Sequence, residues 1–340
     1  MKSVKKFLKD LFTTKPLGAL GLIILLIFVF MAIFADLIAP YPMVGGSLQT
    51  NVIDKLQEPY LTMSAAERAE IRANGDNIYW LGTDSLGRDL LSYLIYGART
   101  SVILCLCCVI LSTVLSVLIG TLSATIGGKF DLIVQRFVDA WQCIPSMLIL
   151  LMLMSILGNG MPQLIFALSV PNGISGSRMI RSSAFQVKDS GYVKSAELLG
   201  CTTWWKTIRH VIPNTLPLII TNMAGSIGGV VMMEASLNFL GYGVDPGTPS
   251  WGYLITNQGR DNMYVAPWLT VCPGIFIAVM VFAANMFGDG VRDIMDPRLK
   301  GGVGTYSTKK IAKVSKKLIK KANKQAAREE AKAAKAAKTV

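Results

Sequence analysis

Long apolar runs restrict the fold of this chain more than any other feature of its sequence. The first run, residues 17–39, is long enough to cross the hydrocarbon core of a bilayer, which takes about 20 helical residues. A cleaved signal peptide has an apolar stretch of only about 7–15 residues, so we expect residues 17–39 to be an uncleaved transmembrane helix. Hydrophobic residues make up 52% of the chain and its mean hydropathy is +0.47, which argues against a soluble globular protein.

Further apolar runs extend this prediction to an all-α polytopic membrane protein with six transmembrane helices. We expect the other five spans at residues 101–126, in a run ending near 157, and at 161–180, 215–240 and 269–287. The fourth span is the least regular, since Pro171, Asn172, Gly173 and Gly176 interrupt it and would free backbone groups that need partners inside the bundle.

The net charge of +13 comes from the ends of the chain and does not indicate nucleic-acid binding. Basic residues crowd into the lead, residues 1–16, and the tail, residues 301–340, as the positive-inside rule predicts for cytoplasmic flanks. We therefore expect both termini to lie in the cytoplasm. The lipid bilayer itself is an expected partner of the chain. The Lys/Ala-rich tail fits either a basic helix on the membrane surface or a solvated tail, and its block of like charges favours the second.

The sequence carries no residue pattern for catalysis or metal binding. His210 is the only histidine, which excludes a cluster of histidine ligands, and we interpret the six cysteines as small apolar packing residues. No G-x-x-x-x-G-K-[ST] phosphate loop occurs, so the chain has no ATPase site of that type. We expect no catalytic residue, no metal and no bound cofactor.

The polar stretch 40–99 between the first two spans is predicted to be an extracytoplasmic loop. It contains a mixed-charge helical piece, SAAERAEIRANGD, and then an amphipathic helix in which Leu90, Leu91, Leu94 and Ile95 form one face, which suggests a helix on the membrane surface. Two turns precede that helix, and an Asp–Arg pair within them could equally be a solvated ion pair of little energetic value. The turns comprise Gly82, Thr83 and Asp84, and then Gly87, Arg88 and Asp89.

A polar, helix-forming segment at residues 189–214 lies between two apolar blocks, and we call it the elbow. Asp189 or Ser190 can cap a short helix over 192–199, and Gly200 supplies the left-handed stop on which such a helix commonly ends. A second short helix capped by Thr202 or Thr203 is predicted to run through 210, before Pro213 ends it. Two short helices joined at a glycine suit the groove of another protein, but spacing alone fits a plain connector equally well.

Three charged residues within or beside the predicted spans are candidates for the transport path or for helix packing. Arg136 and Asp139 are three residues apart and can pair on one helix face, with a role in the transport path or in helix packing equally open. Glu234 is expected near the outer end of the fifth span.

The elbow resembles the cytoplasmic coupling loop of bacterial ABC-importer permeases, whose pattern is Glu-Ala-Ala, then Gly, then a hydrophobic–Pro ending. Aligned on the glycine, the family's Glu falls on a lysine, which puts in doubt any salt bridge made by that Glu. The resemblance implies that the loop contacts an ATPase through residues among Tyr192, Lys194, Ser195, Ala196, Glu197, Gly200, His210 and Pro213.

Three other phrases resemble the dipeptide and oligopeptide branch of these permeases: LGTDSLGRD before the second span, EASLNFLGYGVDPGTPSWG after the fifth, and GDGVRDIMDPRL after the sixth. The resemblance is to the second (C-type) permease subunit. It implies a type I importer fold with a five-helix core over residues 100–300 and an outer loop and helix after the first span.

The same resemblance implies a homologous second permease subunit, two ABC ATPase subunits that use ATP and Mg, and an extracytoplasmic peptide-binding protein. Nickel chelates or other small solutes remain alternative substrates within this branch. An ion-driven secondary transporter would need acidic residues at the membrane midplane, and Asp139 and Glu234 are expected nearer the span ends. A membrane scaffold or enzyme is the other alternative, and the lack of a catalytic constellation disfavours it.

Overall fold

The structure is a computed structural model that describes residues 2–44, 47–74, 77–245 and 247–295. The predicted basic tail, residues 301–340, lies outside the described residues. The chain begins with helix α1 (Lys2–Thr14), continues in α2 (Pro16–Ile33), and then forms the short α3 (Ala35–Ile38). Pro16 occupies the first turn of α2, where a missing N–H costs no helical hydrogen bond.

The segment between α3 and the second span holds only short elements. Strands β1 (Met43–Val44) and β2 (Ser47–Leu48) pair antiparallel, a 3-10 turn covers Val52–Asp54, and α4 covers Ala65–Asn74. Helix α4 confirms the predicted mixed-charge helix. It starts with a capping box in which Ser64 N–H donates to Glu67 Oε2 at 2.8 Å and Glu67 N–H donates to Ser64 Oγ at 3.3 Å.

The predicted surface helix is the first part of helix α5 (Leu90–Ile126), which runs without a break for 37 residues. The separate amphipathic helix was therefore a wrong prediction. Leu90, Leu94 and Ile95 are buried, because the apolar face that suggested a membrane surface packs against the rest of the protein. At Gly97 the indole ring of Trp251 comes so close that a Cβ would lie 2.7 Å from it.

The third span is broken. Helices α6 (Gly128–Gln142) and α7 (Ser146–Leu157) meet at an angle of 88° around Pro145. Within the described residues, four helices are long and apolar enough to cross a membrane: α2, α5, the continuous stretch Thr203–Phe239, and α13 (Trp268–Met295). The bent pair is a fifth candidate if it counts as one span.

Helix α8 (Met161–Lys188) fills the place of the predicted fourth span, but it is unbroken and longer than predicted. The predicted interruption does not occur, because the residues that prompted it serve helix packing. Gly173 lies against Leu115 and Gly176 against Ser116 of α5. The Asn172 side chain donates to the carbonyl of Leu168 at 2.9 Å, one turn back along the helix.

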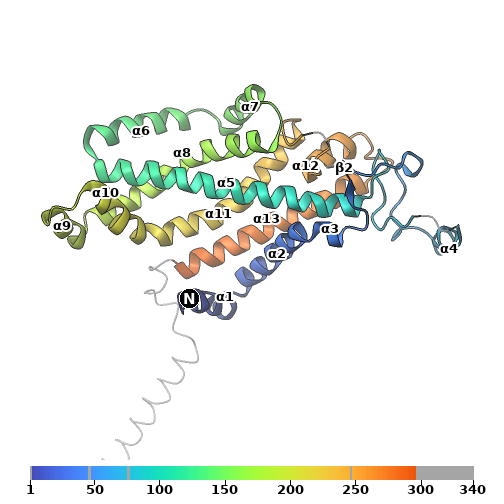
Figure 1. The fold of residues 1–340 in the computed structure, drawn as a ribbon, viewed down its shortest axis with the longest axis horizontal. Coiled ribbons are helices and arrows are strands. Elements are labelled where there is room, and N and C mark those ends of the chain that lie inside the picture. The colour runs from blue at the N-terminus through green and yellow to red at the C-terminus, as the bar shows by residue number, and fades with distance from the viewer. Residues whose placement is uncertain (1, 45–46, 75–76, 246, 296–340) are drawn as a thin grey trace, which may run out of the picture. The chain divides into compact units, whose positions relative to one another are not determined.

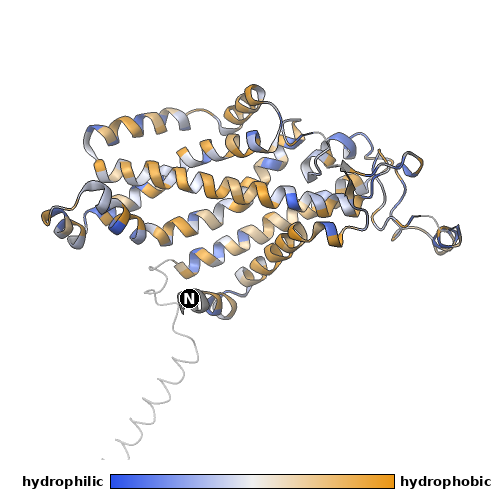
Figure 2. Ribbon diagram, in the orientation of Figure 1, coloured by the Kyte–Doolittle hydropathy of each residue, from blue (hydrophilic) through white to orange (hydrophobic). Residues whose placement is uncertain are grey.

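The remaining elements are α9 (Gly191–Leu198), α10 (Thr203–Lys206), a π-helical turn (Thr207–Val211), α11 (Ile212–Phe239), α12 (Trp251–Leu254) and a second π-helical turn (Ile255–Gly259). Small residues let the long helices pack closely. A Cβ on Gly18 of α2 would lie 2.9 Å from Gly290 of α13, and one on Gly288 would lie 3.0 Å from Gly225 of α11. Figure 1 shows these rods side by side, and Figure 2 shows that apolar residues dominate along them. The all-helical membrane fold is confirmed.

Candidate functional site

The first half of the elbow folds as predicted. Helix α9 starts after Ser190 and runs over Gly191–Leu198, and Gly200 adopts a left-handed conformation with φ of +84°. The N–H of Gly200 donates to the carbonyl of Glu197, and the N–H of Cys201 to that of Ala196, which closes the helix end. Ala196 is buried and Ser195 is exposed, its hydroxyl donating to the Gly191 carbonyl at 2.9 Å.

The second half of the elbow differs from the prediction. Thr202 caps α10, its hydroxyl accepting from the N–H of Trp205 at 3.3 Å, as the sequence indicated. The helix does not end at Pro213, however, because a π-helical turn at Thr207–Val211 leads directly into α11, and the helix continues past the proline. The chain is therefore helical without a break over Thr203–Phe239, passing through one π-helical turn.

An ion pair joins the two halves across the glycine. Lys206 Nζ lies 3.0 Å from Glu197 Oε2, and only 4% of the lysine side chain is exposed. Lys194, which stands where the family pattern has Glu, pairs at 3.6 Å with Asp189, and both side chains are solvated, so this pair is worth little. The charge that ties α9 to α10 is thus Glu197.

The outer surface of the elbow is apolar. Leu198 and Leu199 are 89% and 86% exposed, and Trp204 and Trp205 are more than half exposed. Sequence reasoning missed these four residues. Their signal was present, since two adjacent leucines and two adjacent tryptophans in a polar segment cannot all turn inward. The rings of Tyr192 and His210 lie near each other, with centroids 6.5 Å apart.

The elbow is also tied to the end of α5. Thr207 Oγ1 and Thr125 Oγ1 are 3.0 Å apart, and next to the elbow Lys188, the last residue of α8, donates from Nζ to the carbonyl of Ala124 at 2.8 Å. The elbow is therefore fixed against the helical bundle.

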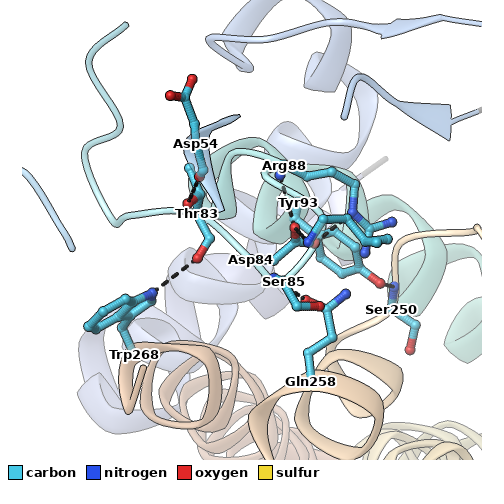
Figure 3. Close-up of polar contacts among 10 residues, drawn as sticks. Asp54, Thr83, Asp84, Ser85, Arg88, Tyr93, Ser250, Gln258 and Trp268 are labelled. Carbon is cyan, nitrogen blue, oxygen red and sulfur yellow. Dashed lines mark hydrogen bonds and ion pairs between the residues drawn. The ribbon is translucent and has the colours of Figure 1, made fainter. Parts of the chain in front are cut away.

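The outer motif forms a buried clamp, drawn in Figure 3. Thr83 and Asp84 are fully buried, and Arg88 is nearly so. Asp84 accepts from the N–H groups of Leu86 and Arg88, and its second oxygen lies 2.6 Å from Arg88 Nε. The interpretation as a solvated ion pair was wrong, because neither side chain reaches solvent.

The clamp reaches the C-terminal half of the chain at three points (Figure 3). The indole N–H of Trp268 donates to the Thr83 carbonyl at 3.2 Å, and Ser85 N–H donates to Gln258 Oε1 at 3.1 Å. The Arg88 guanidinium lies 4.9 Å from the ring centre of Tyr93, whose hydroxyl accepts from the N–H of Ser250 at 3.5 Å. These contacts bury the motif against the rest of the protein. Its side chains therefore have a structural role.

Asp89 and the two glycines of the motif complete the clamp. Asp89 caps α5 by accepting from Ser92 N–H at 2.7 Å, and burial raises the pKa of its carboxyl. Gly82 and Gly87 both have positive φ, and a Cβ on Gly87 would lie 1.7 Å from the carbonyl oxygen of Asn51. Only glycine fits there.

Glu234 lies in α11, five residues before its end, and is fully buried. Its Oε1 accepts from Asn238 Nδ2 at 2.7 Å and from Ser250 Oγ at 3.1 Å. Ser250 also contacts Tyr93, so a polar chain links α11 to the outer clamp. Within the described residues no cation pairs with this carboxyl.

Arg136 and Asp139 form the predicted pair on α6, with Arg136 Nη1 3.5 Å from Asp139 Oδ2. Arg178 of α8 also pairs with Asp139, a contact that sequence spacing could not show. All three side chains are solvent-accessible rather than buried as packing residues would be.

Comparison with known proteins resolves the family. The model described as "Binding-protein-dependent transport system inner membrane component" matches residues 116–301, which is more than half of the chain. The chain belongs to this permease family. A second model, "N-terminal TM domain of oligopeptide transport permease C", matches residues 10–59 and covers the first span.

Individual relatives carry related descriptions. The oligopeptide transport system permease protein OppC of Bacillus subtilis is 30% identical over 85% of this permease and 88% of its own length. The dipeptide transport system permease protein DppC of Haemophilus influenzae is 34% identical over 83% and 91%. A structure of the MetNI methionine ABC transporter matches with a TM-score of 0.47 and 15% identity, over 60% of this permease and 96% of that chain. A score of that size supports no inference.

The permease fold places the elbow and the outer clamp at opposite ends of one helical rod. Figure 1 shows α9 and α10 at one end of the bundle, and α12 and β2 toward the other. The stretch Thr203–Phe239 begins in the elbow and carries Glu234 at its far end. One helix therefore runs from the elbow to Glu234, which Ser250 and Tyr93 link to the clamp.

Proposed function

We propose that this permease is half of the translocation path of an ATP-driven importer of di- or oligopeptides, and that the elbow couples it to an ATPase. The observation that carries the proposal is the exposed apolar surface of Leu198, Leu199, Trp204 and Trp205. Such a cluster on a projecting element is typical of a protein-binding site. The peptide substrate is supported by the descriptions of the relatives.

The complex that fits this role has four additional subunits of three kinds. We propose a homologous second permease, two ABC ATPase subunits that use ATP and Mg, and an extracytoplasmic peptide-binding protein, with the N- and C-termini of this chain in the cytoplasm. We propose that the ATPase subunits supply the cofactor site and the catalytic residues of the complex. The basic residues of α1 and of the tail sequence support the proposed orientation.

Coupling follows from the continuity of the helices. Closure of the ATPases would press on the apolar face of the elbow. Because α8 runs unbroken to Lys188 and the next rod starts at Thr203, both transmit the displacement as nearly rigid bodies, which is the usual basis of alternating access. The Lys206–Glu197 pair keeps α9 and α10 together during this movement.

The direct test is purification of the tagged chain from membranes together with its partners, followed by an ATPase assay. We expect a second permease and ATPase subunits to co-purify, and hydrolysis to rise when peptide-loaded binding protein is added. Stimulation by a nickel chelate or another solute, and not by peptides, would support an importer but reject peptides as its substrate. A chain that purifies alone and transports with an ion gradient but without ATP would contradict the proposal.

The buried carboxyl of Glu234 does not favour an ion-driven transporter. It accepts two hydrogen bonds within the protein and is closed off from solvent, whereas a coupling site must be reached by the ion.

A further inference from the structure

A narrow apolar cavity lies where helices α2, α5, α11 and α13 meet. Its volume is about 110 Å³, and among the described residues only apolar side chains line it. All four helices contribute to its wall: Leu25 comes from α2, Cys105 and Val109 from α5, Ile227 from α11, and Met280 from α13. The cavity is therefore a feature of the helical bundle and not of a surface loop.

The lining of the cavity suits neither water nor a peptide. A buried water molecule needs about 2–4 polar partners, and a peptide brings backbone N–H and C=O groups that also need them. The Cys105 sulfhydryl is directed at the Ile227 carbonyl, with its sulfur 3.7 Å from that oxygen. Apolar cavities of about 150 Å³ stay dry and take up apolar molecules such as benzene. The occupant that fits this cavity is therefore a hydrocarbon.

The cavity reaches the surface of the bundle at Leu106. Cys105 and Met280, deeper in the cavity, are buried, whereas the Leu106 side chain is 48% exposed. On the same side of α5, Ile103 and Ile110 are also exposed, at a spacing of three and four residues from Leu106. Because α5 is long and apolar enough to cross a membrane, acyl chains of the bilayer have access to this side of the helix.

Arg99 fixes the depth of the cavity in the membrane. Its Nε donates to the carbonyl of Ala32, close to the end of α2, at 2.9 Å. The 18 residues of α2 rise about 27 Å, close to the roughly 30 Å of a hydrocarbon core, so Arg99 lies near one edge of that core. Val102 and Val109 line the cavity about 5 Å and 15 Å further along α5. The cavity therefore lies in the half of the membrane nearer to Arg99.

Arg99 also places a positive charge at the level of the lipid head groups. Its Nη2 lies 2.8 Å from Asp36 Oδ2, and 34% of the arginine side chain is exposed. A guanidinium has five N–H donors, so it can bind a phosphate oxygen in addition to Asp36 and the Ala32 carbonyl. A cation about one helical turn outside an apolar cavity matches a phosphate group followed by an acyl chain.

We infer that the cavity and Arg99 form a binding site for one phospholipid, whose acyl chain enters the cavity and whose phosphate binds the guanidinium. A helix, about 10 Å wide, is too large for the cavity. The inference goes beyond the proposed function and does not rest on it. Because Ile227 belongs to the continuous helical stretch Thr203–Phe239, the bound acyl chain packs against the helix that begins in the elbow.

The test is photolabelling of the full-length permease, purified with its accompanying subunits and reconstituted into vesicles of phosphatidylcholine and phosphatidylglycerol. A small fraction of the phosphatidylcholine carries a diazirine on one acyl chain at the depth of Cys105, about 9 Å from Arg99. Mass spectrometry of the digested protein locates the adducts. We expect adducts on Cys105 and Met280, which are buried from surface lipid, in addition to adducts on the exposed Ile110.

Val109→Phe should lower the yield of adducts on Cys105 and Met280 at least fivefold, because the benzyl group fills part of the cavity. The adduct on Ile110 should not change. Val114→Phe is the matched control, since Val114 is exposed on the same helix and does not line the cavity. Adducts confined to exposed residues in the wild type would show only surface lipid and overturn the inference, as would undiminished labelling of Cys105 in Val109→Phe.

Substitution of Arg99 tests the phosphate contact without altering the cavity lining. Arg99→Gln should lower labelling of Cys105 severalfold, and Arg99→Lys, which keeps the charge, should lower it less. Equal labelling of Arg99→Gln and the wild type, or equal labelling by a photoreactive hydrocarbon without a phosphate, would exclude a phospholipid site. Labelling of Cys105 that disappears when a second permease is present would instead assign the cavity to a side chain of that subunit. None of these outcomes alters the proposed transport function.

Discussion

Lys206 reaches back across Gly200 to Glu197, so that a buried ammonium and a solvated carboxylate hold the two halves of the elbow together. The separation is 3.0 Å, and 59% of the Glu197 side chain is exposed against 4% of that of Lys206. The pair is therefore asymmetric, and its two members should respond differently to substitution.

Glu197→Gln should be more damaging than Lys206→Met. The first change leaves a buried ammonium without its carboxylate, which costs up to about 3 kcal/mol, while the second removes the buried charge and leaves the glutamate in solvent. We expect Glu197→Gln to lower both the thermal stability of the elbow, followed by limited proteolysis, and peptide-stimulated ATPase activity. Equal losses in the two variants would show that the asymmetry has no energetic consequence.

Gly200→Trp should uncouple ATP hydrolysis from transport. Within this chain a Cβ at Gly200 would meet nothing within 4 Å, so a side chain there starts in open space, where a docked partner would lie. Gly200→Ala is the matched control, because both variants bear the cost of about 1–2 kcal/mol for a side chain at φ of +84°. Normal peptide uptake by the tryptophan variant, with membrane insertion intact in both, would exclude a close-fitting groove around Gly200.

Asp89 should make the stability of the outer clamp depend on pH. Burial raises the pKa of its carboxyl in the folded protein, so the folded state favours the protonated form. The resulting stabilisation is complete below the ordinary aspartate pKa and is lost as the pH rises through the raised, folded-state pKa.

Asp89→Asn should remove this pH dependence. The amide keeps an oxygen to cap α5 at Ser92 N–H, but it cannot ionise. In thermal unfolding measured from pH 4 to pH 7.5, the melting temperature of the variant should gain on that of the wild type as the pH rises. A constant difference between the two proteins across this range would show that the Asp89 carboxyl does not titrate with a raised pKa.

The helices could be predicted from sequence because apolar length and capping residues act locally. Gly200 shows this well, since a single φ requirement fixed the end of α9. Pro171 and Pro213 misled the prediction for a shared reason. A proline is tolerated more readily in a membrane helix than in a soluble one, and here α8 and α11 continue through both positions.

Burial was less predictable than helix position. The apolar face that contains Leu90 and Leu94 has the same sequence pattern whether membrane or protein covers it. The structure shows that protein covers it. The apolar surface of the elbow, which includes Leu198 and Trp204, is the opposite case. Large apolar side chains are usually buried, and here they are exposed. Roles of individual elbow residues in binding an ATPase remain predictions, since they depend on a partner.

Glu234 gives a test of the rod that joins the elbow to the outer clamp. Its carboxyl is the only side chain in the described residues that accepts hydrogen bonds from both Asn238 of α11 and Ser250 beyond it. Glu234→Ala would leave the buried Ser250 hydroxyl without its acceptor, at about 1–3 kcal/mol, would leave the Asn238 amide only the Glu234 backbone carbonyl, and would weaken the link between α11 and the clamp. Glu234→Gln is the matched control, because it keeps an oxygen acceptor at the same place and carries no charge to desolvate.

In the reconstituted complex, the ratio of peptide-stimulated to basal ATPase activity should fall severalfold for Glu234→Ala and stay near the wild-type value for Glu234→Gln. If alanine leaves that ratio intact, the outer clamp does not communicate with the elbow through α11. A loss of equal size in both variants would instead assign a role to the negative charge itself.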